Sequence, residues 1–180
     1  MAHDERYDWQ PLLDDLTTRR ERALAMGGPD RVQRQCDLGK ATVRDRLDHF
    51  LDPGSFVELG QLADSMDPGL AEKGYLAADG CVTGIGEVDG RRVAVAAYDF
   101  TVMAGTMGAV NEEKVTRLRE LVLRQRIPIV WMLDSAGARV GSATGSTFAG
   151  AGALFRGQVR VSGVVPPVGA VLGHCAAGTA

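Results

Sequence analysis

Three short glycine-rich segments follow apolar runs in the second half of the sequence. They are residues 99–108 (DFTVMAGTMG), 134–139 (DSAGAR) and 173–178 (GHCAAG). Where such a segment connects a strand to a helix, its backbone N–H groups have no partner inside the helix and can bind an anion. Small residues let a ligand approach those N–H groups closely. We therefore expect the second and third segments to stabilise an oxyanion with backbone amides.

The ionisable side chains in these segments are few, and each has a structural interpretation beside a catalytic one. Asp99 and Asp134 begin turns, and we predict that both cap the backbone rather than act as catalysts. His174 and Cys175 are neighbours, and adjacent strand residues point to opposite faces, so we do not expect a catalytic dyad. We interpret Cys175 as a small core residue. The segments contain no evident general base, which favours chemistry carried by backbone amides.

A parallel sheet is needed to bring the three segments together. Helices and strands alternate in this half of the chain, which predicts parallel pairing with right-handed crossovers, and ligands bind outside the carboxyl ends of such strands. Asp89 and Gly90 predict a hairpin. We expect 61–79 to be a surface loop and Arg119 to lie off the apolar face of its helix. The expected strands are 55–59, 81–88, 91–98, 127–133 and 164–172, and the expected helices are 11–24, 43–51, 108–126 and 146–161.

The composition is that of a globular protein. Of the 180 residues, 45% are hydrophobic and 24% are charged, which suits one domain or a large part of one. The net charge of −3 argues against a general nucleic-acid binder. The three cysteines form no CxxC pair, which excludes a zinc ribbon and argues against a disulfide framework. No apolar run reaches the ~18 residues of a membrane span, and the N-terminus is charged, so we expect a cytoplasmic protein.

Seven segments, taken in order, resemble the carboxyltransferase (beta) subunit of biotin-dependent acyl-CoA carboxylases, of the propionyl-CoA carboxylase beta type. One such segment alone would be a weak signal, whereas seven in order cover nearly the whole chain. The seven are 39–46 (GKATVRDR), 51–60 (LDPGSFVELG), 79–91 (DGCVTGIGEVDGR), 99–108, 134–139, 162–166 (SGVVP) and 173–178.

The resemblance implies an α/β fold of the crotonase-like (ClpP/crotonase) kind, built from repeated ββα units, with an N-terminal helical arm. Residues 1–60 are expected to form the arm and the first strand. Residues 61–180 are expected to form a crotonase-like acyl-CoA-binding domain. The whole chain corresponds to the N-terminal half of family members, which are much longer, so this domain is expected to be incomplete at its C-terminal end.

The resemblance also implies a reaction, in which CO2 moves from carboxybiotin to the α-carbon of an acyl-CoA of the acetyl- or propionyl-CoA class through an enolate. The biotin ureido nitrogen can take the α-proton, and no metal is expected in this chain. The implied oxyanion donors are the backbone amides of Ala177 and Gly178. The implied acyl-CoA-binding residues are Gly105, Ala136, Gly137, Ala138, Arg139, Cys175 and Ala176.

The implied partners are a biotin carboxylase and biotin carboxyl carrier subunit, a C-terminal carboxyltransferase half or partner chain, and further copies of the same chain. Neither nucleic acid nor a membrane is expected. Arg139 is expected to pair either with a CoA phosphate or with a neighbouring carboxylate. Lys114 matches a lysine of the family, although a solvated position is the expectation. Ala104, Ala136 and Ala177 stand where the family has glycine.

Two other functions stay open at this point. A biotin-independent crotonase-like acyl-CoA decarboxylase would use the same enolate. A non-catalytic assembly subunit would keep the fold without the chemistry, and the alanine substitutions together with the short length favour it. A hydratase is disfavoured because it needs acid and base groups that the segments do not contain.

Overall fold

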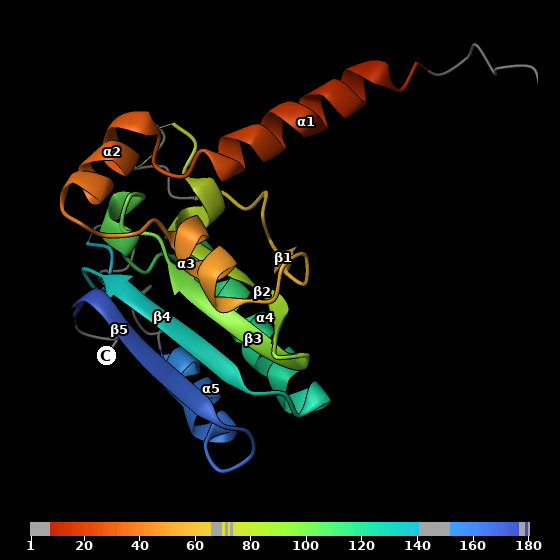
Figure 1. Cartoon of the computed structure of the whole chain (residues 1–180), viewed down its shortest axis with the longest axis vertical. Helices are drawn as coiled ribbons and strands as arrows, with labels where there is room; N and C mark the ends of the chain where they lie inside the picture. Colours follow the sequence, from red (N-terminus) through yellow and green to blue (C-terminus); the bar gives the residue numbers. More distant parts are fainter. Residues whose placement is uncertain are drawn as a thin grey trace, which may run out of the picture.

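The computed structural model describes residues 8–65, 70, 72, 74–140, 152–176 and 179. Within them the chain forms a five-stranded mixed sheet with helices on both faces (Figure 1). The strand order β1-β2-β3-β4-β5 follows the sequence. The first two pairings are antiparallel and the last two are parallel. The strands are β1 (Val57–Leu59), β2 (Cys81–Val88), β3 (Arg91–Tyr98), β4 (Ile129–Ser135) and β5 (Pro167–Cys175).

Helices occupy the arm and both crossovers of the parallel pairs. α1 extends away from the sheet, whereas α3 packs against it (Figure 1). α2 was not expected, because its residues are mostly polar and show no apolar period; it begins with a proline, a residue suited to the first turn of a helix. The helices are α1 (Gln10–Leu24), α2 (Pro29–Asp37), α3 (Val43–Phe50), α4 (Ala109–Gln125) and α5 (Gly152–Val161), with 3-10 turns η2 (Ala77–Gly80) and η3 (Met103–Gly105).

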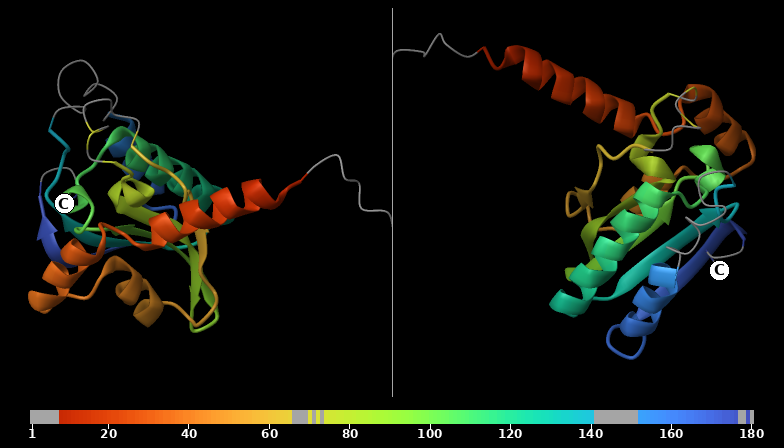
Figure 2. Two further views of the ribbon diagram at one scale, coloured as in Figure 1. Left: turned by 90° about the horizontal axis from the view of Figure 1, so that it is seen from above. Right: turned by 180° about the vertical axis from the view of Figure 1, so that it is seen from behind.

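Alternation along β3 produces two separate cores. Val93, Val95 and Ala97 face the layer that contains α3. Ala94 and the other intervening residues face the layer of α4 and α5, which lies on the opposite side of the sheet (Figure 2). Successive strand side chains point to opposite faces, so a continuous apolar strand serves both layers. The crossover helices keep the carboxyl ends of β3, β4 and β5 at one edge.

The predicted hairpin is confirmed. Asp89 and Gly90 have φ angles of 50° and 71°, as a two-residue turn with both residues left-handed requires. The expected boundaries of the last strand are wrong by three residues. Val164 donates its N–H to Val161 in a turn that closes α5, so β5 begins at Pro167 and extends through residue 175.

Two further expectations are corrected. The segment 61–79 is not wholly a surface loop, because residues 76–79 are buried. The Asp79 side chain in particular is fully buried, and its carboxylate pairs with Arg139. Arg119 is also buried rather than solvated, stacked on Trp131. Of the expected helix 146–161, residues 146–151 lie outside the described residues.

Candidate functional site

The three glycine-rich segments meet at the carboxyl edge of the parallel strands, as expected. Met107 of the first segment forms a parallel bridge with Ala138 of the second. The Met107 N–H donates to the Gly137 carbonyl at 2.8 Å, and the Arg139 N–H donates to the Met107 carbonyl at 2.9 Å. Ser135 is in register with Cys175 at the end of β5. Residues 30 and 32 positions apart in the chain are thus joined by backbone hydrogen bonds.

Most amides of the second segment are already bonded within the protein, which corrects the expectation that this segment presents several free donors. Ala136 donates to the Ala104 carbonyl at 2.9 Å, and Gly137 donates to the Ser135 hydroxyl at 3.0 Å. Among the described residues, the Ala138 amide donates to no group. This segment can therefore offer a ligand one amide rather than a row of them.

The third segment is described only in part. The Ala176 amide donates to the Ser135 carbonyl at 3.2 Å. Ala177 and Gly178, the expected oxyanion donors, lie outside the described residues, and their role stays a prediction. The Cys175 thiol lies near the Thr179 carbonyl, 3.6 Å away. It packs against the core beneath α4 and α5.

Arg139 connects the first and second segments from inside the protein. Its guanidinium pairs with Asp79, and the two side chains are 3% and 0% exposed. It also donates to the Thr106 carbonyl at 2.9 Å. Of the two expected partners, the neighbouring carboxylate is the one that the structure shows. A Cβ on Gly108 would lie 2.4 Å from this guanidinium, which accounts for glycine there.

Asp134 connects the N-terminal arm to the ends of β4 and β5. Its carboxylate is 0% exposed and accepts from Arg46 at 2.9 Å and from Lys40 at 3.4 Å. It also accepts from the His174 backbone N–H at 3.1 Å. A Cβ on Gly173 would lie 2.1 Å from this carboxylate. Asp134 thus has a structural role, though it acts from within β4 rather than as a helix cap.

His174 and its neighbours form a stacked cluster beside this ion pair. The His174 and Phe100 rings lie 4.9 Å apart with 14° between their planes. The Lys40 ammonium is 5.2 Å from the centre of the Phe100 ring.

Asp99 accepts from the Thr101 N–H at 2.9 Å, which agrees with the predicted capping role. Burial raises the pKa of the Asp99 carboxyl.

Lys114 corrects another expectation. Its ammonium donates to the Ala78 carbonyl at 3.0 Å and to the Cys81 carbonyl at 2.6 Å, and burial lowers its pKa. It therefore supports the turn that carries Asp79. Sequence reasoning missed three residues that hold the site together. Lys40 and Arg46 lie in the segment 39–46 and Asp79 lies in the segment 79–91, and the resemblance of these two segments to the family was the signal that could have identified them.

Ala104 and Ala136, at positions where the resemblance implies glycine, differ in their backbone conformation. Ala104 has a φ of 53°, a left-handed conformation that costs a residue with a Cβ about 1–2 kcal/mol. Ala136 is exposed and is not among the residues with positive φ, so alanine is accommodated there.

Within the described residues, no group of three or more His, Cys, Asp or Glu side chains could hold a metal ion. No helix in that part of the chain is long and apolar enough to cross a membrane.

Comparison with known proteins agrees with this geometry. The family model of the carboxyl transferase domain matches residues 34–180. The chain belongs to the carboxyl transferase domain family. This carboxyl transferase domain is 42% identical over 167 residues to the propionyl-CoA carboxylase carboxyltransferase subunit of Haloferax mediterranei, covering 92% of this chain and 32% of that protein. It is 37% identical to the methylmalonyl-CoA decarboxylase subunit alpha of Veillonella parvula, covering 94% and 33%.

The solved structures place the carboxyl transferase domain in the same fold. The transcarboxylase 12S structure with methylmalonyl-coenzyme A and methylmalonic acid bound superimposes with a TM-score of 0.88 at 36% identity, covering 96% of this chain and 34% of that one. The predicted crotonase-like fold is therefore confirmed. The chain spans about a third of the length of the curated relatives it matches.

Proposed function

We propose that this chain is the acyl-CoA-binding part of a carboxyltransferase, the component of an acyl-CoA carboxylase that moves CO2 from carboxybiotin to the α-carbon of an acyl-CoA. The substrate belongs to the acetyl- or propionyl-CoA class. One observation carries the proposal: three glycine-rich segments meet at the carboxyl ends of β3, β4 and β5 in a chain of the carboxyl transferase domain family. Ligands of parallel sheets bind at this edge.

Backbone amides do the work of stabilising charge in this proposal. When the α-proton leaves, negative charge develops on the thioester oxygen, and the Ala177 and Gly178 amides bind that oxygen. Ala138 supplies a further amide that has no partner among the described residues. Removing one such donor typically lowers the rate by ~10²–10³. Gly105, Ala136, Gly137 and Ala176, together with the backbone of Cys175, line the approach, and the small size of these residues lets the acyl-CoA come close.

The carboxylates of the three segments are engaged in structural bonds. Asp99 accepts from Thr101, and Asp134 is paired with Arg46 and Lys40. We therefore assign no general base to either. Carboxybiotin, when bound, supplies CO2, and the ureido nitrogen freed by its loss takes the α-proton, so that a C–C bond replaces a C–H bond at the α-carbon. The chain's own residues hold the thioester and orient its α-carbon.

The proposal includes partners. A biotin carboxyl carrier, charged by a biotin carboxylase subunit, brings carboxybiotin to the acyl-CoA. A second carboxyltransferase half or partner chain completes the site, and further copies of the chain assemble with it. The hexamer assembly described for transcarboxylase 12S supports the last point.

The test is transfer of isotopic label from free carboxybiotin to propionyl-CoA or acetyl-CoA, with the partner chains present. We expect labelled methylmalonyl-CoA or malonyl-CoA, together with saturable binding of the acyl-CoA. The absence of both transfer and CoA binding would leave a non-catalytic assembly subunit and contradict the proposal.

Decarboxylation of an acyl-CoA without biotin is the second candidate; a relative with 37% identity is named a methylmalonyl-CoA decarboxylase subunit, which favours decarboxylation, and the test below decides the need for biotin. Decarboxylation passes through the same enolate and would need the same amides. Loss of CO2 from methylmalonyl-CoA at an unchanged rate after all biotin is removed with avidin would favour this second function. Strict dependence on carboxybiotin would exclude it.

A further inference from the structure

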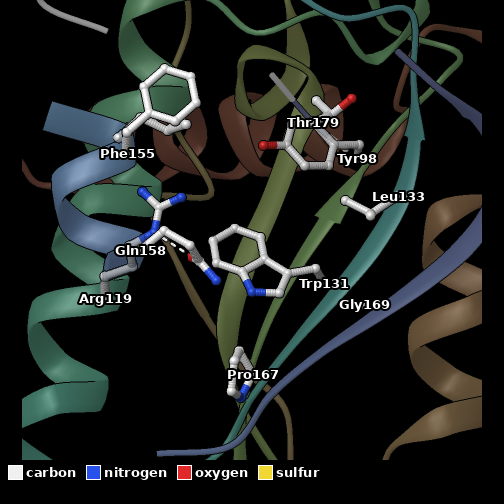
Figure 3. Close-up of a pocket in the computed structure, with 10 residues that line it drawn as sticks. Tyr98, Arg119, Trp131, Leu133, Phe155, Gln158, Pro167, Gly169 and Thr179 are labelled. Carbon is white, nitrogen blue, oxygen red and sulfur yellow. Dashed lines mark hydrogen bonds between the residues drawn. The ribbon is translucent and has the colours of Figure 1, made fainter. Parts of the chain in front are cut away.

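A cavity that the proposed carboxyl transfer does not use lies between the sheet and the helices α4 and α5. Its volume is about 280 Å³. Figure 3 shows its walls, which come from the ends and middles of β3, β4 and β5 and from the inner faces of the two helices. Apolar side chains make up much of the wall, Leu154 and Phe155 among them. Arg119, Trp131, Gln158 and Tyr98 contribute the polar atoms.

Arg119 is the unusual member of this set, because it is a buried cation that has no carboxylate partner among the residues the structure describes. The residue is 4% exposed, and its guanidinium lies 4.7 Å from the centre of the Trp131 ring. Its Nε donates to the neutral Gln158 side chain at 3.3 Å. Its Nη1 has no hydrogen-bond partner among the described residues. Arg139, which is equally buried, shows the ordinary arrangement, since it is paired with Asp79.

Within the described part of the chain, no group neutralises the charge of Arg119. Tyr98, Cys81 and Glu112 are the titratable groups that act on it electrostatically, and none forms an ion pair with it. Burial is the largest influence, and it lowers the Arg119 pKa. A guanidinium nevertheless stays ionised in proteins. An ionised group that is buried and unpaired is strongly unfavourable, whereas one paired with a carboxylate in the same place is tolerated.

A second unsatisfied donor lines the same space. Trp131 is 8% exposed, and its Nε1 has no hydrogen-bond partner among the described residues. In Figure 3 the indole, the guanidinium and the Tyr98 hydroxyl surround the space below Phe155. Buried donors of this kind are paired in the great majority of cases. A ligand that suits this cavity would carry an anionic hydrogen-bond acceptor for the two unsatisfied donors and an apolar part for the apolar wall.

We propose that this cavity is a carboxylate-binding site, in which Arg119 pairs with the anionic group and Trp131 donates a hydrogen bond beside it. Leu154 and Phe155 contact the apolar part of the ligand. The carboxylate comes either from a small free carboxylic acid or from a carboxylate side chain of a polypeptide segment packed at β5, whose Val168 and Val171 are half or more exposed. The site is independent of the carboxyl transfer proposed above.

The test uses the 180-residue chain with Trp9→Phe, so that Trp131 is its one tryptophan. Isobutyrate is titrated while Trp131 fluorescence is recorded, with isobutyramide as the uncharged control. We expect a saturable change with the carboxylate and none with the amide. Arg119→Met should weaken binding by about 10- to 100-fold, the usual effect of losing a hydrogen bond to a charged group. Arg117→Met, an exposed site on the same helix, should bind as the parent does.

Thermal unfolding distinguishes the two sources of the carboxylate. If a protein side chain occupies the cavity, isobutyrate will have no effect, Arg119→Met will lower the melting temperature, and Arg119→Lys will restore part of the loss because it keeps the charge. The proposal is overturned if isobutyrate has no effect and Arg119→Met melts at the parent temperature or above. It is also overturned if isobutyrate has no effect and the Met and Lys variants lose stability equally, because that result assigns Arg119 to packing alone.

Discussion

Arg46 on α3 donates to the buried carboxylate of Asp134 at the end of β4, 88 residues away in sequence, across 2.9 Å. The same carboxylate accepts the backbone N–H of His174 on β5. One ion pair therefore fixes the N-terminal arm, the end of β4 and the start of the third glycine-rich segment with respect to one another. We therefore expect the position of the proposed acyl-CoA site to depend on this contact, even though neither side chain is assigned to the chemistry.

We expect Asp134→Asn to destabilise the protein by about 3–5 kcal/mol, because Arg46 would be left as a buried charge without its partner. Urea denaturation measures the loss. The matched control is Asp15→Asn, which breaks the exposed pair with Arg19 and should change the free energy of unfolding by about 0.5 kcal/mol or less. Equal effects of the two substitutions would show that the Asp134 pair contributes little.

A pair of glycines on β5 tests whether the Asp134 carboxylate sets the backbone of the third segment. In Gly173→Ala, the new Cβ would lie 2.1 Å from Asp134 Oδ1, whereas in Gly169→Ala the nearest atom is 3.9 Å away. We expect the first variant to lose both stability and acyl-CoA binding, since the strand end must move. The second variant should keep acyl-CoA binding. Equal retention of binding by both, measured by calorimetric titration, would contradict the assignment.

Replacing Ala104 with glycine should stabilise the chain by up to about 1 kcal/mol. Its φ of 53° is unfavourable for a residue with a Cβ and is relieved in glycine. The exposed helical Ala153 is the control, because Ala153→Gly relieves no positive φ and should not stabilise the chain. Chemical denaturation gives the free energy of unfolding of the two variants and of the parent. A loss of stability in Ala104→Gly would show that the backbone is not strained at this position.

Alkaline pH should weaken the fold through Cys81. Burial raises the pKa of this thiol from 9.0 to about 12, so between those values the folded protein keeps a proton that the unfolded chain loses. Stability due to this group is complete below pH 9 and falls as the pH rises toward 12, by up to about 1.4 kcal/mol per pH unit. Unfolding free energies at pH 8.5 and 10.5, under reducing conditions, should show a smaller decrease in Cys81→Ala than in the parent. Equal decreases would show that Cys81 does not titrate in this window.

The local pattern of the sequence determined much of the fold. The Asp89-Gly90 turn, the apolar runs of β2, β3 and β4, and the helix between β3 and β4 all depend on residues close together in the chain. Chain order and the crossover rule then brought the three glycine-rich segments to one edge of the sheet. The resemblance of the seven segments was enough to indicate the family.

The tertiary structure alone decided which groups at that edge are free. The backbone N–H groups of Ala136 and Gly137 already donate hydrogen bonds to Ala104 and Ser135. The local sequence pattern does not predict these hydrogen bonds. From the sequence, Asp79, Lys114 and Arg119 are all expected to be exposed to solvent. Asp79 lies at the end of a polar segment, and Lys114 and Arg119 lie outside the apolar face of their helix. Asp79 and Arg119 are buried, and Lys114 is partly buried, because partners from distant segments, or the layer of α4 and α5, surround them. Burial and the pairing of charges depend on contacts between residues far apart in the chain, and those contacts exist only in the folded protein.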